Sequence, residues 1–368
     1  MTDTNEPKNT TYCVTELSLD NQIRIHYLTE TKCGRPRHKR GRPPTTTPED
    51  TRVDLRTYDI IAVSTSGGID SQGAMDEAYR AAELQGVTDR LVAIHADLGR
   101  FEWAGNIELV RKQCEWYGIP LHTCKRPQGD LLEHVVAKHD ANLANDSMIE
   151  IEERDERGKK TGEVLTMTVA EAAATGLRCP WYGIGQTQYC TGDHKTSQIK
   201  KIYTALKKQW REDTGETRPC RLLEILGLRA DESDARKAKP QFAERISKSN
   251  KTELHVDQWL PIHHWTKDEA WTRAELNEVP TAHSYHLNGY RDGMPRHSCI
   301  FCIYAASCTK GEGRDAILLA ARHNPDLLDE YCAVEAYTGY SFTPATSLTE
   351  IREQIANESL ISIEEVTA

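Results

Sequence analysis

One stretch constrains the fold of this chain most strongly, a turn with the sequence Ser64-Thr65-Ser66-Gly67-Gly68-Ile69-Asp70-Ser71. It follows a short apolar run at residues 59–63 and precedes an amphipathic stretch that ends near Leu84. The glycines carry no Cβ, so the backbone can turn tightly and approach an anion closely. The N–H groups and the dipole of a following helix favour phosphate there. The pattern predicts a phosphate loop between a buried strand and a helix; the alternative is an ordinary glycine-rich turn.

Strand-like and helix-like segments alternate after this turn. The apolar residues 91–97, 120–124 and 222–228 predict further strands, and residues 106–118 predict a helix. Strands that alternate with helices form a parallel sheet through right-handed crossovers, with helices on both faces. The sequence therefore predicts an α/β, Rossmann-like fold.

The composition changes at both ends of this pattern. Residues 1–56 form a basic arm, predicted to be disordered because its stretch 31–50 has almost no apolar residues. Residues 57–310 are the predicted α/β domain, with regular structure from Tyr58. Residues 311–368 read as a helical extension.

The composition also limits the cellular context. The content of 38% hydrophobic and 28% charged residues is that of a soluble globular protein. No apolar run approaches the roughly 20 residues of a membrane span, and the N-terminus does not resemble a signal peptide. We therefore expect a cytoplasmic protein without membrane contact, whose 11 cysteines are reduced and available for a metal or for catalysis. The net charge of −10 argues against a uniformly basic surface for nucleic acid.

The spelling S-x-S-G-G-x-D-S resembles the PP-loop of ATP pyrophosphatases and phosphoadenylylsulfate (PAPS) reductases, and no Walker A pattern occurs. Four further segments follow in the order that this family shows. They are the stretch from Asp97 to Glu102, where Leu98 replaces the family's threonine; the stretch from Cys190 to Lys195; the stretch from Gly227 to Arg236; and Pro261 with Trp265.

The resemblance implies an adenine nucleotide, ATP or PAPS, bound together with Mg²⁺. It implies catalytic roles for Asp70, Asp97, Lys195 and Arg229. It also implies nucleotide binding by these residues together with Ser64, Thr65, Ser66, Gly67, Gly68, Ile69, Ser71, Glu232 and Arg236. Trp265 is expected in the core.

Three cysteines, Cys299, Cys302 and Cys308, form a C-x-x-C-x5-C pattern that predicts a metal site. Iron–sulfur relatives of the family pair such a motif with a cysteine at the position of Cys190, which the resemblance makes the fourth ligand. The alternatives are Cys179, Cys220 and Cys332. The resemblance favours a [4Fe–4S] cluster over zinc, although cysteine ligation by itself permits both. The ATP pyrophosphatases of DNA phosphorothioation share the three-cysteine pattern, but Tyr290 stands where they have their first cysteine.

Within the arm, Arg40-Gly41-Arg42 and Pro43 resemble an AT-hook, which would enter the minor groove of A·T-rich DNA. A basic disordered tail without a nucleic-acid partner is the alternative.

Three functions fit these features. The favoured one is ATP-dependent sulfur transfer, with nucleic acid as the acceptor as in DNA phosphorothioation and a cysteine desulfurase as a sulfur-donor partner. The second is a PAPS or adenylylsulfate reductase, although no cysteine follows Cys332 to serve as the usual C-terminal nucleophile. The third is a non-catalytic nucleotide sensor or DNA-binding accessory protein, against which the full set of polar motif residues argues.

Overall fold

The computed structural model describes residues 14–17, 23–26, 51–154, 160–175, 179–180, 189–250, 252–276, 294, 297, 299–303, 312–343 and 347–367. These residues belong to two compact units. Unit 1 comprises Met1–His95, Glu108–Thr123 and Lys200–Thr281, and unit 2 comprises Ala96–Ile107, Cys124–Ile199 and Ala282–Ala368. Segments of the two units alternate along the chain, so each unit is assembled from stretches that are distant in sequence.

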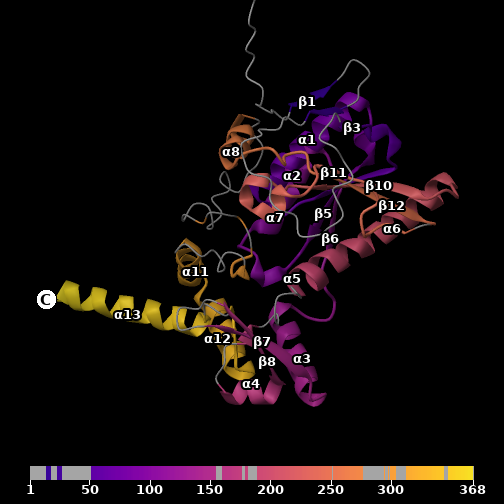
Figure 1. The fold of residues 1–368 in the computed structure, drawn as a ribbon. Coiled ribbons are helices and arrows are strands. Elements are labelled where there is room, and N and C mark those ends of the chain that lie inside the picture. The colour runs from indigo at the N-terminus through magenta and orange to yellow at the C-terminus, as the bar shows by residue number, and fades with distance from the viewer. Residues whose placement is uncertain are drawn as a thin grey trace, which may run out of the picture. The chain divides into compact units, whose positions relative to one another are not determined.

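A six-stranded sheet forms the centre of unit 1 (Figure 1). Its strands, in spatial order, are β11 (Phe242–Ala243), β12 (Leu254–Trp259), β10 (Cys220–Leu226), β4 (Ile60–Ser64), β5 (Leu91–Ala96) and β6 (Leu121–Cys124). The central pairs are parallel, and only the short strand β11 is shown to run antiparallel to its neighbour. The predicted Rossmann-like α/β fold is confirmed, with a mixed rather than purely parallel sheet.

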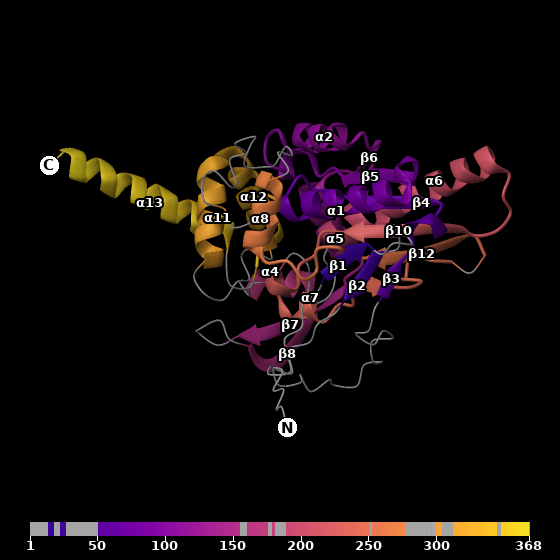
Figure 2. The same ribbon diagram turned by 90° about the horizontal axis from the view of Figure 1, so that it is seen from above.

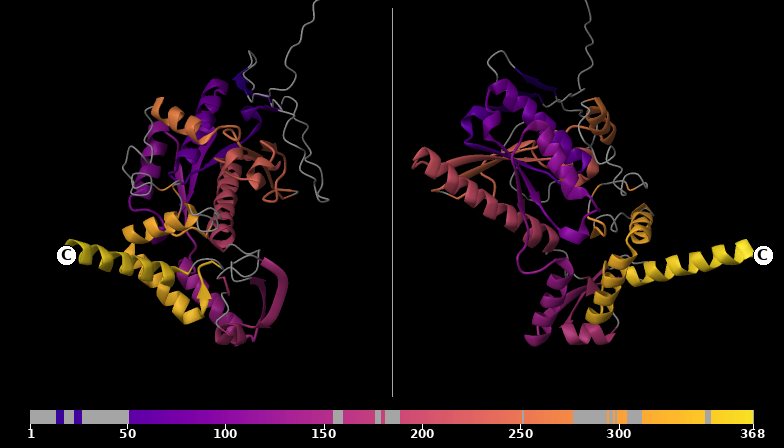
Figure 3. Two further views of the ribbon diagram at one scale, coloured as in Figure 1. Left: turned by 60° about the vertical axis from the view of Figure 1, so that its left-hand side comes forward. Right: turned by 180° about the vertical axis from the view of Figure 1, so that it is seen from behind.

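Helices flank this sheet. They are α1 (Ile69–Gln85), α2 (Asn106–Tyr117), α6 (Ser197–Thr214), the short α7 (Asp234–Lys237) and α8 (Lys267–Leu276). The chain runs from β4 through β5 to β6 in one direction and then returns to β10 on the other side of β4. A right-handed crossover therefore places α6 on the opposite face from α1, as Figure 3 shows. The strand order thus reverses between β4 and β10, where open α/β sheets bind ligands at the carboxyl ends of their strands.

Regular structure begins before Tyr58, contrary to the sequence-based expectation. A three-stranded antiparallel sheet is formed by β1 (Val14–Leu17), β2 (Ile23–His26) and β3 (Thr51–Val53), followed by a 3-10 turn at Leu55–Thr57. Val53 and Leu55 are buried, and the Leu55 N–H donates to Oε1 of Gln85 at 2.8 Å. Isolated apolar residues in a polar stretch gave no local signal for this packing. The basic stretch at residues 31–50, including Arg40, Gly41 and Arg42, lies outside the described residues.

Unit 2 combines helices with a β-hairpin (Figure 2). Its elements are α3 (Leu131–Ala144), β7 (Met148–Arg154), β8 (Lys160–Thr168), α4 (Val169–Thr175), β9 (Cys179–Pro180), α5 (Tyr189–Thr191), α11 (Glu312–His323), α12 (Pro325–Thr338), β13 (Tyr340–Ser341) and α13 (Leu348–Thr367). Strands β7 and β8 pair antiparallel, and β9 and β13 pair in parallel. None of the described helices combines the length and apolar character needed to cross a bilayer.

The core of unit 2 is built around Tyr331 of α12, which is buried. Its ring meets the rings of Phe101, Phe301 and Phe342 edge-on at centroid distances of 6.0, 5.0 and 5.9 Å. Edge-to-face contacts of this kind stabilise by roughly 1 kcal/mol each beyond their buried area. Phe101 follows β5, and Phe301 lies within the C-x-x-C motif. The core therefore holds two predicted motifs beside each other.

Candidate functional site

The predicted phosphate loop is a strand-to-helix turn in unit 1, and its conformation requires glycine. Gly67 has a φ of 78°, a left-handed conformation that side chains with a Cβ rarely adopt, and Gly68 is the N-cap of α1. The loop is held by its own groups: the Ser71 hydroxyl donates to the Gly68 carbonyl at 2.9 Å and accepts from the Ser66 N–H at 3.1 Å. Ser71 therefore shapes the loop and does not present a free hydroxyl.

Two other hydroxyls of the loop have no hydrogen-bond partner among the described residues. They are the Oγ of Ser64 and the Oγ1 of Thr65, and both are buried. The backbone around them is fixed, because the Thr65 N–H donates to the Ile94 carbonyl at 2.9 Å, and His95 donates from Nδ1 to the Thr65 carbonyl at 3.0 Å. An unsatisfied buried hydroxyl costs about 1–3 kcal/mol. Such groups are suited to a polar ligand that completes their hydrogen bonds.

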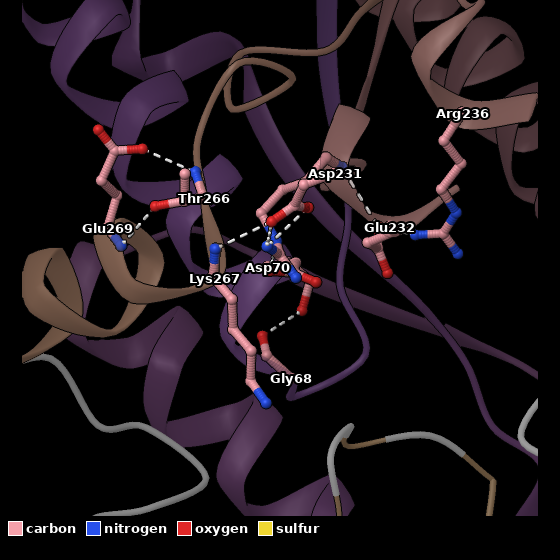
Figure 4. A network of polar contacts seen from close by, with 10 residues as sticks. Gly68, Asp70, Asp231, Glu232, Arg236, Thr266, Lys267 and Glu269 are labelled. Atoms are coloured by element: carbon pink, nitrogen blue, oxygen red, sulfur yellow. Dashed lines mark hydrogen bonds and ion pairs between the residues drawn. The ribbon is translucent and has the colours of Figure 1, made fainter. Parts of the chain in front are cut away.

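Arg229 joins this loop to the end of the neighbouring strand β10 through its ion pairs with Asp70 and Asp231, two residues that Figure 4 labels. Its Nε donates to Oδ1 of Asp70 at 2.6 Å, and its Nη1 donates to both carboxylate oxygens of Asp231, at 2.8 and 2.7 Å. The Arg229 side chain is buried, whereas that of Asp70 is 23% exposed. In this structure the guanidinium charge is thus shared by two carboxylates at the first turn of α1 and the turn after β10.

Gly227 allows this close approach. A Cβ at this position would lie 2.3 Å from the carbonyl oxygen of Asp70 and 2.8 Å from the backbone N of Ser71. Both atoms belong to the backbone and cannot rotate away. The motif from Gly227 to Arg236 thus begins with glycine because its backbone packs directly on the phosphate loop. No sequence pattern indicated this role of Gly227.

Glu232 and Arg236, also predicted to bind nucleotide, lie in the same network. Oε2 of Glu232 accepts from the Arg229 N–H at 3.3 Å and forms an ion pair with the Arg236 guanidinium. Arg236 is in turn linked through its carbonyl to Nε2 of His263, at 3.0 Å. These residues therefore order the turn that carries Arg229.

In unit 2, Lys195 lies in a π-helical turn, Gly192–Thr196, and its Nζ is 3.8 Å from the Sγ of Cys299. Such turns often occur at functional positions. The negative charge of the Cys299 thiolate, aided by Cys190, Cys302 and Glu102, raises the pKa of the Lys195 ammonium against the opposing effect of burial. Burial raises the pKa values of the Cys190 and Cys299 thiols. Lys195 and Cys190, from one segment, thus interact with Cys299 and Cys302, from a segment about 100 positions further along the chain.

A polar chain runs beside this cluster. Glu102 accepts from the Asn106 side-chain amide at 2.7 Å, and Asn106 accepts from Nε2 of His297 at 2.7 Å. The backbone adds a further link, because the Ile300 N–H donates to the Phe101 carbonyl at 2.9 Å. The predicted catalytic residue Asp97 accepts from the Gly99 N–H at 2.6 Å, which closes the turn after β5.

Two histidines support the turn that carries Lys195. Nδ1 of His134 lies 3.1 Å from Nε2 of His194, which is buried. In a neutral pair one ring donates and the other accepts. Burial, and next the nearby His134, lower the pKa of His194 to about 4. The pair is therefore neutral at pH 7.

The predicted metal site is only partly within the described residues, because Cys308 lies outside them. Across the described ranges, no three His, Cys, Asp or Glu side chains are arranged so that they could hold a metal ion. Cys190, Cys299 and Cys302 form no disulfide within the described part of the chain, and all three lie close enough to Lys195 to affect its pKa. These sulfur donors have the chemistry that thiolate ligation of a cluster requires. Cys220 and Cys332, two of the alternative ligands, are buried thiols, and Cys220 belongs to unit 1.

The structure thus assembles the predicted residues in two sets. Asp70, Arg229, Glu232, Arg236 and the loop meet in unit 1. Lys195 and the cysteines meet in unit 2, which also contains Asp97. Convergence of the two sets on one nucleotide stays a prediction. Sequence reasoning missed Asp231, although its partner Arg229 is only two residues away, and it missed Asn106 and His297, whose hydrogen bond joins positions 191 residues apart.

No protein-family model and no curated protein matches this sequence. Among solved structures, a PAPS reductase from Candida auris in complex with phosphate is 14% identical, with 64% of this chain and 80% of that chain covered and a TM-score of 0.33. The U34-tRNA thiolase NcsA from Methanococcus maripaludis with its [4Fe–4S] cluster is also 14% identical, with 76% and 80% covered and a TM-score of 0.28. Both similarities are distant, so the function of this chain must be inferred from its own residues.

Proposed function

We propose that this chain is a PP-loop enzyme that binds an adenine nucleotide at residues 64–71 and uses it in sulfur transfer. The observation that carries the proposal is the position of this loop. It follows β4 at the point where the strand order reverses towards β10, and the buried hydroxyls of Ser64 and Thr65 have no hydrogen-bond partner in the part of the chain that the structure describes. A loop of this kind offers backbone N–H groups, two hydroxyls and a helix dipole to phosphate.

The proposed chemistry takes place at the α-phosphate of ATP. An oxygen of the acceptor attacks the α-phosphorus, and the bond to pyrophosphate breaks. Sulfur then replaces the adenylylated oxygen, which leaves as AMP. In this scheme the loop stabilises the negative charge on the leaving pyrophosphate. Arg229 orients Asp70, whose carboxylate is suited to Mg²⁺ or to the attacking group.

The sulfur chemistry is assigned to the cysteines of unit 2. Cys190, Cys299 and Cys302, with Cys308, would hold a [4Fe–4S] cluster, which would supply a binding site for sulfide. Lys195 keeps its positive charge in this position, since the cysteines in their thiolate form raise its pKa. A positive group in this position stabilises thiolates and would hold an anionic sulfur species.

Incubating the purified protein with A·T-rich duplex DNA, sulfide and a thiol reductant, and with either ATP or PAPS in the presence of Mg²⁺, tests the proposal. Release of AMP and pyrophosphate from ATP is the expected result. Consumption of PAPS with release of sulfite would establish the reductase instead. Binding without turnover of either nucleotide would favour a sensor.

The acceptor is proposed to be DNA, bound through Arg40, Gly41 and Arg42 of the arm, with a cysteine desulfurase as sulfur donor in the cytoplasm. Deleting residues 1–56 also removes β1–β3, so a triple change of Lys39, Arg40 and Arg42 to alanine is the cleaner test. It should abolish binding to A·T-rich duplexes and leave nucleotide affinity unchanged. Equal mobility shifts for both proteins would exclude the arm as the anchor.

A further inference from the structure

The loop site contains less available positive charge than its motif suggests. Arg229 is the buried cation next to the loop, but it is bound by both Asp70 and Asp231. Two carboxylates around one guanidinium leave this part of unit 1 without a net positive charge. A nucleoside triphosphate carries several negative charges, so a further protein cation beside the loop would strengthen its binding in addition to Mg²⁺.

The turn after β12 brings such a cation to the loop. Three hydrogen bonds tie this turn to the segment that carries Arg229: the Ala230 N–H donates to the His263 carbonyl at 2.7 Å, Nε2 of His263 pairs with the Arg236 carbonyl, and the Lys267 N–H donates to Oδ2 of Asp231 at 3.1 Å. The start of α8 is therefore connected to Asp70 through Asp231 and Arg229.

A second contact fixes the same turn against α1. The ring of Trp265 packs so closely on Gly73 that a Cβ there would lie 2.8 Å from Cζ3 of the indole. Gly73 is in the second turn of α1, just beyond the loop. Lys267, two residues after Trp265, is thus held near the first turn of α1 from two directions.

The side chain of Lys267 is exposed and takes part in none of the ion pairs found among the described residues. In Figure 4 it extends from the start of α8 towards Gly68. Its backbone makes the bond to Asp231, so its ammonium is available to a ligand. No sequence motif singled out this residue.

We propose that Lys267 is a phosphate-binding residue of the loop site and contacts the polyphosphate of the bound nucleotide. This inference rests on the proposed function. The turn after β12 supplies Lys267 as the cation that contacts phosphate. Arg229 has a different role, because it positions Asp70. Since an ammonium ion interacts with phosphate largely through its charge, its contribution should grow with the number of phosphates.

Titration calorimetry with ATP, AMP and adenosine tests Lys267→Gln. The backbone N–H is retained in this variant, so α8 should begin as before and the unfolding temperature should not change. We expect about tenfold weaker binding of ATP, a smaller loss for AMP and none for adenosine. Lys267→Arg should recover most of the ATP affinity. Lys239→Gln, a change at an exposed lysine of the same unit, is the matched control and should have no effect.

The salt dependence of ATP binding should also become shallower in Lys267→Gln, because one cation is lost from the site. Wild-type ATP affinity and salt dependence in this variant, with ATP binding intact in the wild-type protein, would overturn the role of Lys267 alone. Failure of the wild-type protein to bind any of the three ligands would overturn both this inference and the proposed function.

Discussion

Nε of Arg229 donates to Oδ1 of Asp70 at 2.6 Å, although the two residues are 159 positions apart in the chain. This bond connects the segments that follow β4 and β10, the two neighbouring strands at which the order of the sheet reverses. It holds the first turn of α1 next to the turn after β10.

A double-mutant cycle should detect this ion pair. We expect Arg229→Ala and Asp70→Ala each to destabilise the protein, with a coupling energy of about 1–2 kcal/mol from urea unfolding. The partial exposure of Asp70 keeps this value below that of a fully buried pair. Lys208 and Glu212, an exposed pair on α6, serve as the control and should couple by less than about 0.5 kcal/mol. Equal coupling in both cycles would contradict a special role for the Arg229–Asp70 pair.

Gly227→Ala should disturb the loop without introducing charge. The added Cβ would overlap the backbone of Asp70, so the two turns must separate. We expect a loss of about 1–3 kcal/mol in unfolding free energy and weaker nucleotide binding. Gly192→Ala, where no atom lies within 4 Å of the added Cβ, controls for the methyl group and should leave stability nearly unchanged. A fully stable Gly227→Ala protein would show that the contact is not tight in solution.

Gly68→Val should abolish nucleotide binding while the fold survives. The backbone of Gly68, with φ −77° and ψ 161°, is accessible to valine, so the chain can keep its conformation. The branched side chain would stand where phosphate approaches the loop. Circular dichroism should show native secondary structure, and calorimetry should show no heat of ATP or PAPS binding. Unchanged affinity for both nucleotides would refute the assignment of the loop.

Protein purified without oxygen should be brown if a [4Fe–4S] cluster is present. Serine at Cys299, Cys302 or Cys308 should remove the visible absorbance and the iron, because each change removes one thiolate ligand. Cys114→Ala, a change at a buried cysteine of unit 1, is the control and should retain both. Colourless protein with one zinc ion per chain would be consistent with the cysteine ligands but would exclude the iron–sulfur cluster.

The free energy of unfolding should decrease as the pH falls below 7, because of His194. The pKa of its imidazole is lowered from 6.5 to about 4 in the folded protein, chiefly by burial, so the unfolded chain binds the additional proton between these values. The stabilisation is fully present above pH 6.5 and is lost as the pH falls towards 4. Between pH 7 and 5 this group should contribute a decrease of up to about 2 kcal/mol. In denaturant titrations at several pH values, the free energy of unfolding of His194→Gln should depend less steeply on pH than that of the wild-type protein. An unchanged pH dependence would exclude this histidine as the cause.

The sequence alone determined the local elements around the site. The apolar run 59–63, the serine–glycine turn and the following amphipathic stretch predicted β4, the loop and the start of α1, because the signals for a buried strand, a left-handed glycine and a helix N-terminus are local. The alternation of further segments predicted the α/β fold, and the C-x-x-C spacing drew attention to Cys299 and Cys302.

Only the tertiary structure decided which of these elements meet. The position of β10 beside β4 brings Gly227 against Asp70, and the core around Tyr331 brings Phe101 beside Phe301. These contacts arise from strand order and side-chain packing between distant segments. Local periodicity and turn chemistry specify the elements, whereas the contacts between them depend on how the whole chain buries its apolar surface.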